Sequence, residues 1–368
     1  MEPDATATGT TGAGRTSVGF RTRNVTAARL RFIRQLGVEE VFPIPVRKAD
    51  TGADPDGELD LDPAKDPDRG GGEGDAETLV LRPDHVPSAE SLAETRSHVE
   101  SFGLRFGGIH TVFPSLYDEI AYGTGGSQAQ LAALEDLVGN MGEAGIPVLG
   151  YQWNLTGVGR TDRSKRVRGG AEATAFDRDA YDEDPSHGAG SGERYTEAGF
   201  WERYEAFLER LLPVAEAAGV TLALHPADPP VIDRLDGVPR LFRDVASLRR
   251  AMDAVPSDSH GLKLCLGCVS EMDEDVVDVV RRFGEREEIV FVHFRDVVGA
   301  VPSFHETFVD EGSFDEYEVV RTLRDVGFTG ALLPDHVPRM EGDTDWNHRS
   351  RAYTAGYLRG LLTAADHD

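Results

Sequence analysis

Strand-like apolar segments and longer helix-like segments alternate eight times along this chain, and this alternation limits the possible folds more than any other feature. Strands separated by helices form parallel sheets, because each helix returns the chain to the side from which the next strand starts. Eight such units without a second cluster of strands are typical of a single TIM barrel. A doubly wound sheet is the alternative, but no glycine-rich dinucleotide turn follows an early strand. We therefore expect an α/β chain that folds as one (β/α)8 barrel.

The bounds of the expected elements follow from apolar periodicity and from residues typical of helix ends. The first helix is expected to begin after Asn24, as its N-cap, and to end before Gly37. The expected strands cover residues 17–21, 38–44, 105–113, 146–153, 220–225, 261–267 and 289–295, and a last strand begins at Gly330. That last strand must end at Pro334 or Asp335, because strict alternation cannot send both Asp335 and His336 into the barrel. The later helices are expected at 88–102, 127–144, 196–218, 245–254, 274–283, 314–326 and 349–362.

Three segments do not fit the alternation. Residues 1–15 are small and polar, and we interpret them as a disordered tail before a catalytic barrel domain at 16–365. Residues 47–74 are rich in Asp, Pro and Gly and are interpreted as an acidic loop inserted into the barrel, with disorder favoured over a functional role. Residues 154–194 are expected to be irregular.

The charge of the chain bears on its partners and its habitat. Asp and Glu number 65 against 38 Lys and Arg, which gives a formal net charge of −27. The negatively charged protein would be repelled by the phosphates of nucleic acid or of an anionic membrane, which argues against non-specific binding to either. The lysines are few (Lys48, Lys65, Lys165 and Lys263). A dense acidic surface with few lysines indicates a cytoplasmic protein of a halophile, where concentrated salt screens the self-repulsion; an ordinary acidic enzyme is the alternative.

Targeting signals and cysteines point to the same compartment. The chain has no apolar run of about 18 residues and no N-terminal signal pattern, so neither a membrane span nor a signal peptide is predicted. The two cysteines, Cys265 and Cys268, lie on one apolar segment, which argues against a disulfide framework. A cytoplasmic location is therefore expected. The sequence leaves the oligomeric state open, a homo-oligomer included.

Side chains that can bind a metal lie at the ends of four successive expected strands. Because alternate residues of a strand face opposite sides, the outward-facing leucines of the fifth and sixth strands place His225 and Cys265 inside the barrel. The same argument places His293 on one strand face with Arg295, and Asp335 on one strand face with Leu333 and Ala331. All four residues lie near the C-terminal ends of their strands, the mouth at which barrel enzymes build their sites. One strand histidine is more often a core residue, but four such residues in register favour a metal site. Their donor set suits Mn²⁺, Fe²⁺, Co²⁺ or Zn²⁺ better than Mg²⁺ or Ca²⁺.

Further polar residues at the same rim are candidates to bind a substrate. Asp228 lies in a proline-rich turn directly after His225, although an ordinary rigid turn is the alternative. Arg295 shares a strand face with His293 and could bind a carboxylate with two parallel hydrogen bonds, against the alternative of a structural salt bridge. His305, in the expected loop 303–307, and Arg160, after the fourth strand, are further candidates.

Several short motifs occur in the order, and at the strand ends, that characterise one family of barrels. With these motifs the chain resembles the D-mannonate dehydratase family of the xylose-isomerase-like TIM barrels, over almost its whole length from about Ser17. The motifs are Ala223-Leu-His-Pro-Ala-Asp-Pro-Pro230, Leu264-Cys-Leu-Gly267, Val292-His-Phe-Arg-Asp296, Phe304-His-Glu306, Pro334-Asp-His336 and Gly356-Tyr-Leu-Arg-Gly360, with Leu149-Gly-Tyr-Gln-Trp153 and Arg168-Gly-Gly-Ala171.

The resemblance implies dehydration of D-mannonate to 2-dehydro-3-deoxy-D-gluconate, as in hexuronate catabolism, with one Mn²⁺ or Fe²⁺ ion per subunit. It places the metal ligands on the four residues that strand alternation also selects. It also implies that His336 is the catalytic histidine, supported by a tyrosine that is either Tyr353 or Tyr357. A histidine suits this chemistry because it can take one proton and return another near neutral pH.

Two other classes of function stay open at this point. A sugar isomerase or epimerase could use the same barrel and metal, and only a dehydratase would release water. A non-catalytic protein that binds a sugar acid or a metal would be stabilised by its ligand without forming product, and the intact ligand set disfavours it.

Overall fold

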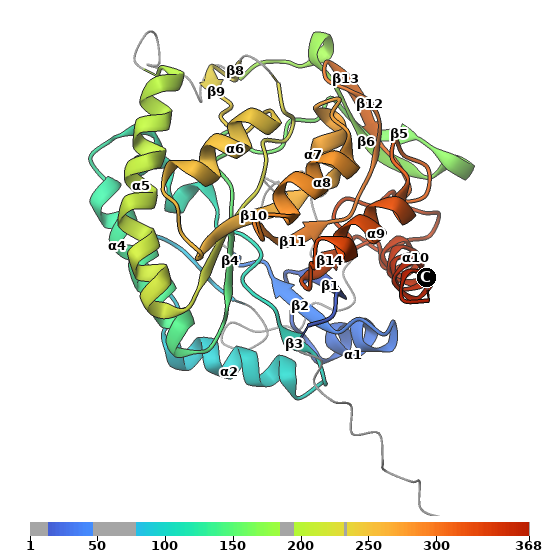
Figure 1. The fold of residues 1–368 in the computed structure, drawn as a ribbon, viewed down its shortest axis with the longest axis horizontal. Helices are drawn as coiled ribbons and strands as arrows, with labels where there is room; N and C mark the ends of the chain where they lie inside the picture. The colour runs from blue at the N-terminus through green and yellow to red at the C-terminus, as the bar shows by residue number, and fades with distance from the viewer. Residues whose placement is uncertain (1–13, 47–78, 185–194, 232–233, 368) are drawn as a thin grey trace, which may run out of the picture.

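The computed structural model describes residues 14–46, 79–184, 195–231 and 234–367. Its central feature is a parallel sheet of eight strands in the order β3-β2-β1-β14-β11-β10-β7-β4. The sheet closes on itself, because Ile109, just after β3, pairs in parallel with Leu149 of β4, with N–O distances of 2.8 Å on both sides of Ile109. Helices surround the ring of strands (Figure 1). The predicted single (β/α)8 barrel is therefore confirmed.

The barrel is built from eight strands and eight principal helices in the described ranges. The strands are β1 (Ser17–Thr22), β2 (Glu40–Pro43), β3 (Arg105–Phe106), β4 (Val148–Tyr151), β7 (Thr221–Leu224), β10 (His260–Cys265), β11 (Ile289–His293) and β14 (Ala331–Leu333). The helices are α1 (Ala27–Gln35), α2 (Ala89–Glu100), α4 (Ser127–Glu143), α5 (Glu197–Ala218), α6 (Val245–Ala254), α8 (Val276–Gly284), α9 (Glu316–Asp325) and α10 (His348–Ala365). Short additional helices are α3 (Asp118–Tyr122) and α7 (Leu266–Glu271).

Helix starts follow from side chains that accept a hydrogen bond from an unpaired backbone N–H of the first turn. Ser88 caps α2 and Thr196 caps α5 in this way. The expected cap Asn24 is wrong, because the side chain of Thr26 accepts from the Arg29 N–H and α1 begins after it. Both residues are good N-caps by type, so the sequence alone could not separate them.

The apolar core has two layers, as strand alternation predicts. Leu222 and Leu224 belong to the large outer cluster between strands and helices. Ala223 belongs instead to a small inner cluster with Phe291 and Leu333. A barrel of eight strands leaves an interior that side chains fill, so inward positions near the mouth are held rigidly by this packing.

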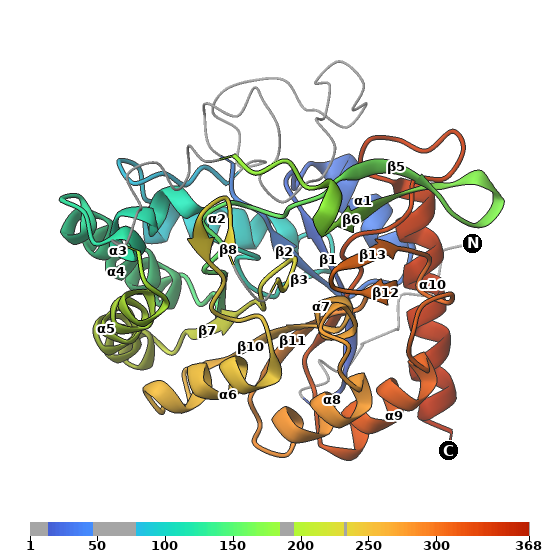
Figure 2. The ribbon, with the colours of Figure 1, turned by 90° about the horizontal axis from the view of Figure 1, so that it is seen from above.

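The expected irregular segment 154–194 contains regular structure in its described part. It forms β5 (Asp162–Arg166) and β6 (Glu172–Asp177), and the expected loop 303–307 contains β13 (Ser303–Glu306), which pairs with β12 (Val297–Ala300). These strands make a second, antiparallel sheet in the order β12-β13-β6-β5 (Figure 2). Because one hairpin follows β4 and the other follows β11, the second sheet lies at the C-terminal mouth of the barrel.

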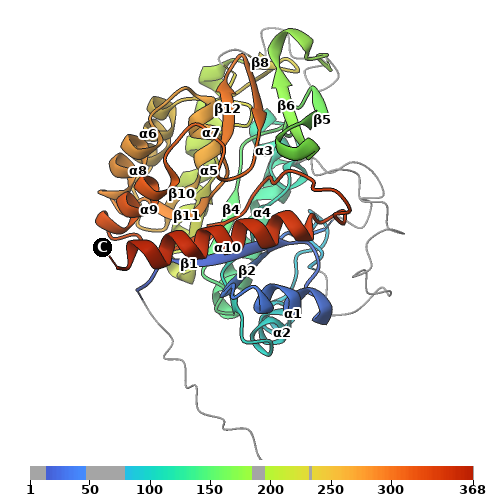
Figure 3. The ribbon, with the colours of Figure 1, turned by 90° about the vertical axis from the view of Figure 1, so that its right-hand side faces the viewer.

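The two ends of the barrel meet. The last helix, α10, lies beside α1 (Figure 3), and Arg359 donates to the carbonyl of Leu36 at the end of α1. Arg15, at the end of the expected tail, forms an ion pair of 2.9 Å with Asp366. Residues 1–13 of that tail and the whole expected acidic loop 47–74 lie outside the described residues. Among described residues, no helix is both long and apolar enough to cross a membrane.

Candidate metal centre

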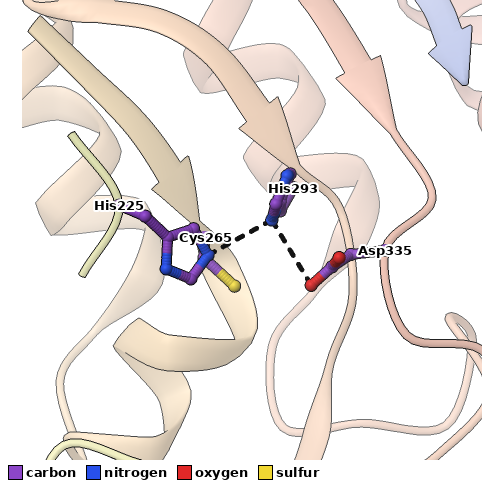
Figure 4. A group of neighbouring side chains, drawn as sticks. All are labelled: His225, Cys265, His293 and Asp335. Atoms are coloured by element: carbon purple, nitrogen blue, oxygen red, sulfur yellow. Dashed lines mark hydrogen bonds and ion pairs between the residues drawn. The ribbon is translucent and has the colours of Figure 1, made fainter. Parts of the chain in front are cut away.

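Four side chains converge at the C-terminal ends of neighbouring barrel strands (Figure 4). His225 follows β7, Cys265 ends β10, His293 ends β11 and Asp335 follows β14. One donor atom from each lies within 4.8 Å of the donor atoms of the other three, and all four residues are buried. The structure thus brings together the four residues that strand alternation selects.

The distances between the donor atoms fit one shared ion. His225 Nε2 lies 3.2 Å from His293 Nδ1, and His293 Nδ1 lies 3.3 Å from Asp335 Oδ2. Ligands bound at about 2.1 Å to one tetrahedral ion are separated by about this much. Two imidazoles, a thiol and a carboxylate are also a donor set that suits a divalent transition metal. The residues present therefore fit the divalent ion that the resemblance implies.

The outer atoms of two ligands are fixed by protein partners. His225 Nδ1 lies 2.7 Å from the carbonyl oxygen of Pro226, to which only a protonated Nδ1 can donate, so Nε2 is left free to bind a metal. Asp335 Oδ1 lies 3.1 Å from Arg21 Nε. Such partners orient a ligand before an ion arrives.

The pKa values of three of the four side chains also favour the protonation states that bind a cation. Burial lowers the pKa of His225, which favours the neutral imidazole that a metal needs. Burial by itself would raise the pKa of Cys265, but a hydrogen bond with Cys268 and the charge of Arg295 bring it well below its usual value. For Asp335, the charges of His293 and His336 outweigh burial, and its pKa is well below the usual range.

His293 has an unusual outer partner. Its Nε2 lies 2.8 Å from Nε2 of His110, a buried residue just after β3. Burial keeps the pKa of His110 well below its usual value, so the His110 ring is neutral. If His293 binds metal through Nδ1, its Nε2–H must donate to His110. His110 therefore fixes which nitrogen of His293 faces the other ligands.

Replacing His110 by phenylalanine is expected to weaken metal binding by about 10- to 100-fold, because the acceptor for the His293 N–H is lost. Titration with Mn²⁺ against a competing chelator measures this directly. His260→Phe is the matched control: His260 is also buried, at the first residue of β10, and bonds to Tyr151 and Tyr204 rather than to a ligand. Equal losses in both variants would show that the effect is one of barrel packing.

His336 lies beside the four ligands rather than among them. Its Nε2 is 3.9 Å from Asp335 Oδ2, and its Nδ1 is 2.5 Å from Glu306 Oε1. Burial by itself would lower the pKa of His336, but the carboxylates of Asp335 and Glu306 raise it to about 9. The ring therefore carries a proton at neutral pH and keeps 14% of its side chain exposed.

A buried network of charges lies next to His336. Arg160 donates to both oxygens of Asp228, at 2.6 and 3.1 Å, and to Glu306 at 2.7 Å. Arg295 donates to Asp228 at 2.8 Å, to Glu271 at 2.7 Å and to Asp335 at 3.2 Å. The nitrogens that were expected to bind a substrate thus already face protein carboxylates. For Arg295 and Asp228 the structural reading fits these contacts better than direct substrate binding.

The remaining candidates lie farther from the cluster. Alternation along β13 buries Glu306, while His305 points to the opposite, partly exposed face. The hydroxyl of Tyr353 lies 3.4 Å from Arg168, and that of Tyr357 lies 3.4 Å from Glu316. In the described part of the chain, neither hydroxyl contacts His336 or a ligand. The structure therefore does not bring His305 or the two tyrosines to the site.

Three residues of the site were missed in the sequence. Glu306 could have been found only from the register of β13, which makes it rather than His305 the inward residue. His110, just after β3, and Arg21, on β1, are each distant in sequence from the residues they contact. Their only signal is an inward-facing polar side chain on an otherwise apolar strand.

Comparison with known proteins agrees with the site. The chain matches the D-mannonate dehydratase (UxuA) family over residues 63–188 and 192–368. It is 30% identical over 303 residues to a mannonate dehydratase of Streptococcus uberis, covering 75% of this chain and 86% of that relative. A mannonate dehydratase of Streptococcus agalactiae is 30% identical over 307 residues, covering 76% and 87%.

Solved structures show the same relationship. The crystal structure of mannonate dehydratase from Streptococcus suis serotype 2 matches with a TM-score of 0.78 and 25% identity, over 96% of this chain and 94% of that one. An L-ribulose 3-epimerase matches with a TM-score of 0.55 at 14% identity, over 96% of each chain, which shows a shared fold alone. With most of its length matched to one family of hydro-lyases, this chain belongs to the D-mannonate dehydratase family.

Proposed function

We propose that this enzyme dehydrates D-mannonate to 2-dehydro-3-deoxy-D-gluconate and water with the help of one divalent metal ion per subunit. The observation that carries the proposal is the convergence of four metal-competent donors with a protonated histidine directly beside them. Membership of the family supports the same reaction. A sugar isomerase or epimerase is less supported, since such proteins share only the fold with this chain.

His225, Cys265, His293 and Asp335 would hold the ion, for which Mn²⁺ or Fe²⁺ suits the donor set. When bound, the ion would act as a Lewis acid that stabilises negative charge on substrate oxygens next to the acidic carbon–hydrogen bond. Arg21 and Arg295 would hold Asp335 in place for this purpose.

His336 would act as the acid and base of the reaction. The reaction removes a proton from the carbon next to the carboxylate and expels a hydroxyl group from the neighbouring carbon. This hydroxyl group leaves as water once it is protonated. A protonated Nε2 facing the cluster can donate to the departing hydroxyl. The neutral imidazole left behind would take up the proton removed from the carbon, so the ring ends in the protonated state in which it began. Glu306 holds Nδ1 on the other side, and Arg160 holds Glu306, so the ring keeps one orientation throughout.

Removal of bound metal by exhaustive chelation is expected to abolish activity, and re-addition of Mn²⁺ or Fe²⁺ is expected to restore it. The assay follows the 2-keto-3-deoxy product in a panel of five- and six-carbon aldonates. Mg²⁺ is the matched control ion, because it prefers oxygen ligands and should restore little. Full activity in the chelated protein would contradict the metal-dependent mechanism.

We also propose that the enzyme works in the cytoplasm of a cell rich in salt, because of its net charge of −27. Raising salt from about 0.1 M to about 1 M shortens the screening length from about 10 Å to about 3 Å. The melting temperature should therefore rise, because repulsion between surface carboxylates is screened. Thermal unfolding across a KCl series checks this, and a melting temperature that stays constant or falls would contradict it.

A further inference from the structure

The segment that follows β14 contains both a candidate metal ligand and the proposed proton carrier, yet it belongs to no helix or strand. β14 ends at Leu333, and residues 334–338 follow it at the mouth of the barrel. Asp335 reaches the other three converging donors, while His336 lies beside them. Neighbours on a regular strand would face opposite sides, so the chain must change direction here. Because the segment is irregular, contacts from outside it must fix that direction.

Arg351 holds the backbone of this segment at its first two residues. Its Nη1 donates to the carbonyl oxygens of Pro334 and Asp335 and lies 3.4 Å from each. Arg351 lies near the start of α10, and 1% of it is exposed. A charged donor binds a carbonyl more strongly than a neutral one does, and burial keeps water from competing for the contact. Arg351 therefore links α10 to the point at which the chain changes direction.

The guanidinium of Arg351 is itself held in place. Its Nε donates to the carbonyl of Trp346 at 2.9 Å. Its Cζ lies 5.1 Å from the centroid of the Trp346 ring, within the range of a cation–π contact. Trp346 is buried and packs edge to face on Phe20 of β1, with ring centroids 5.7 Å apart. Arg351 is thus fixed against the barrel core and presents its Nη1 in one direction.

The later part of the segment is also held by the start of α10. The Ser350 hydroxyl donates to the carbonyl of Pro338, and the side-chain amide of Asn347 donates to the carbonyl of Val337 at 3.5 Å. These contacts come after His336 in the chain. Arg351 instead acts on the carbonyl of Asp335, which belongs to the peptide group that joins Asp335 to His336. Its contact therefore bears most directly on where the His336 side chain leaves the backbone.

Asp335 and His336 depend on this peptide group to different degrees. Two other arginines hold the Asp335 carboxylate, at 3.1 and 3.2 Å. The His336 ring is held by Glu306 at one nitrogen, while its other nitrogen faces the cluster at 3.9 Å from Asp335 Oδ2. Loss of the Arg351 contact should therefore displace His336 more than Asp335.

We propose that Arg351 is a positioning residue for the dehydration, which holds the peptide group between Asp335 and His336 so that His336 faces the departing hydroxyl. The proposal rests on the proposed function, because it names the group that places the proton carrier of that reaction. A misplacement of about 1 Å can lower the rate by about 100-fold. Arg351→Met is therefore expected to lower kcat for D-mannonate by about 10- to 100-fold at saturating Mn²⁺, with little change in KM.

A double-mutant cycle with His336→Asn separates positioning from a general loss of structure. If Arg351 acts through His336, adding Arg351→Met to His336→Asn should lower kcat by less than about threefold, because the group that Arg351 positions is already gone. Product accumulated over long incubations and identified by mass measures these low rates. Equal losses in the two backgrounds would overturn the proposal, and so would an unchanged kcat in the single variant.

Two further variants keep the test decisive. Arg349→Met removes an exposed arginine of the same helix turn, which donates to the carbonyl of Glu341, and should leave kcat unchanged. Arg351→Gln keeps a polar group that is too short to replace the guanidinium, so the same cycle can be run with it if Arg351→Met folds poorly. If unmodified protein converts D-mannonate and the Arg351 variants do so equally fast, only this assignment fails. If unmodified protein leaves D-mannonate unchanged, the proposed function fails, and the assignment fails with it.

Discussion

Replacing His336 by asparagine is expected to lower turnover of D-mannonate by about 10²- to 10⁴-fold, the usual contribution of a positioned acid or base. Asparagine keeps a polar side chain near Glu306 but cannot carry a proton. His336 is not among the four converging donors that could hold a metal, so bound metal should stay at the level of the unmodified protein. Steady-state kinetics and metal analysis of the same preparation measure both quantities.

The matched control for this substitution is His98→Asn, a partly exposed residue of α2 that bonds to the Val25 carbonyl far from the mouth. It should change neither turnover nor metal content. A His336→Asn protein that loses its metal would show that ligand and proton carrier have been confused. Unchanged turnover with full metal content would remove His336 from the mechanism.

Replacing Cys265 by alanine should have an equally large effect by a different route. The variant loses one of four donors, and metal affinity should fall by more than the about 10- to 100-fold typical of an outer partner. Turnover should fall with it at limiting metal. Chelator competition with Mn²⁺ measures the affinity, and excess Mn²⁺ should recover part of the activity.

Cys268→Ala is the matched control for Cys265→Ala. Cys268 is three residues later, is equally buried and lies 3.4 Å from a nitrogen of Arg295. Because it is not among the four converging donors, its removal should cost less metal affinity than removal of Cys265. If the two variants lost metal equally, the sulfur that binds the ion would have to be reassigned.

The barrel and the convergence of four candidate metal ligands could be predicted, because both depend on local patterns. Alternation of apolar residues fixes which side of a strand each residue faces, and parallel strands end at one mouth. His225 and Cys265 could be selected on that basis without knowledge of any long-range contact. The N-cap of α1 shows the limit of local patterns, since Asn24 and Thr26 are both suitable by type.

The charge network could not be predicted, because its members meet only in the folded chain. Arg295 has the right type and position for a substrate carboxylate, but Glu271 and Asp228 occupy its nitrogens. His305 and Glu306 are adjacent, and only the pairing of β13 with β6 and β12 decides which of them is buried.

The most direct test of the central claim is to incubate purified protein with D-mannonate before and after its metal is removed, and to identify the product by mass and NMR. The Mn²⁺-loaded protein is predicted to form a 2-keto-3-deoxy acid, lighter than D-mannonate by one water, and the chelated protein to form none. A product that is an isomer of D-mannonate would contradict dehydration. Undiminished formation of the keto-deoxy acid without metal would contradict the role of His225, Cys265, His293 and Asp335.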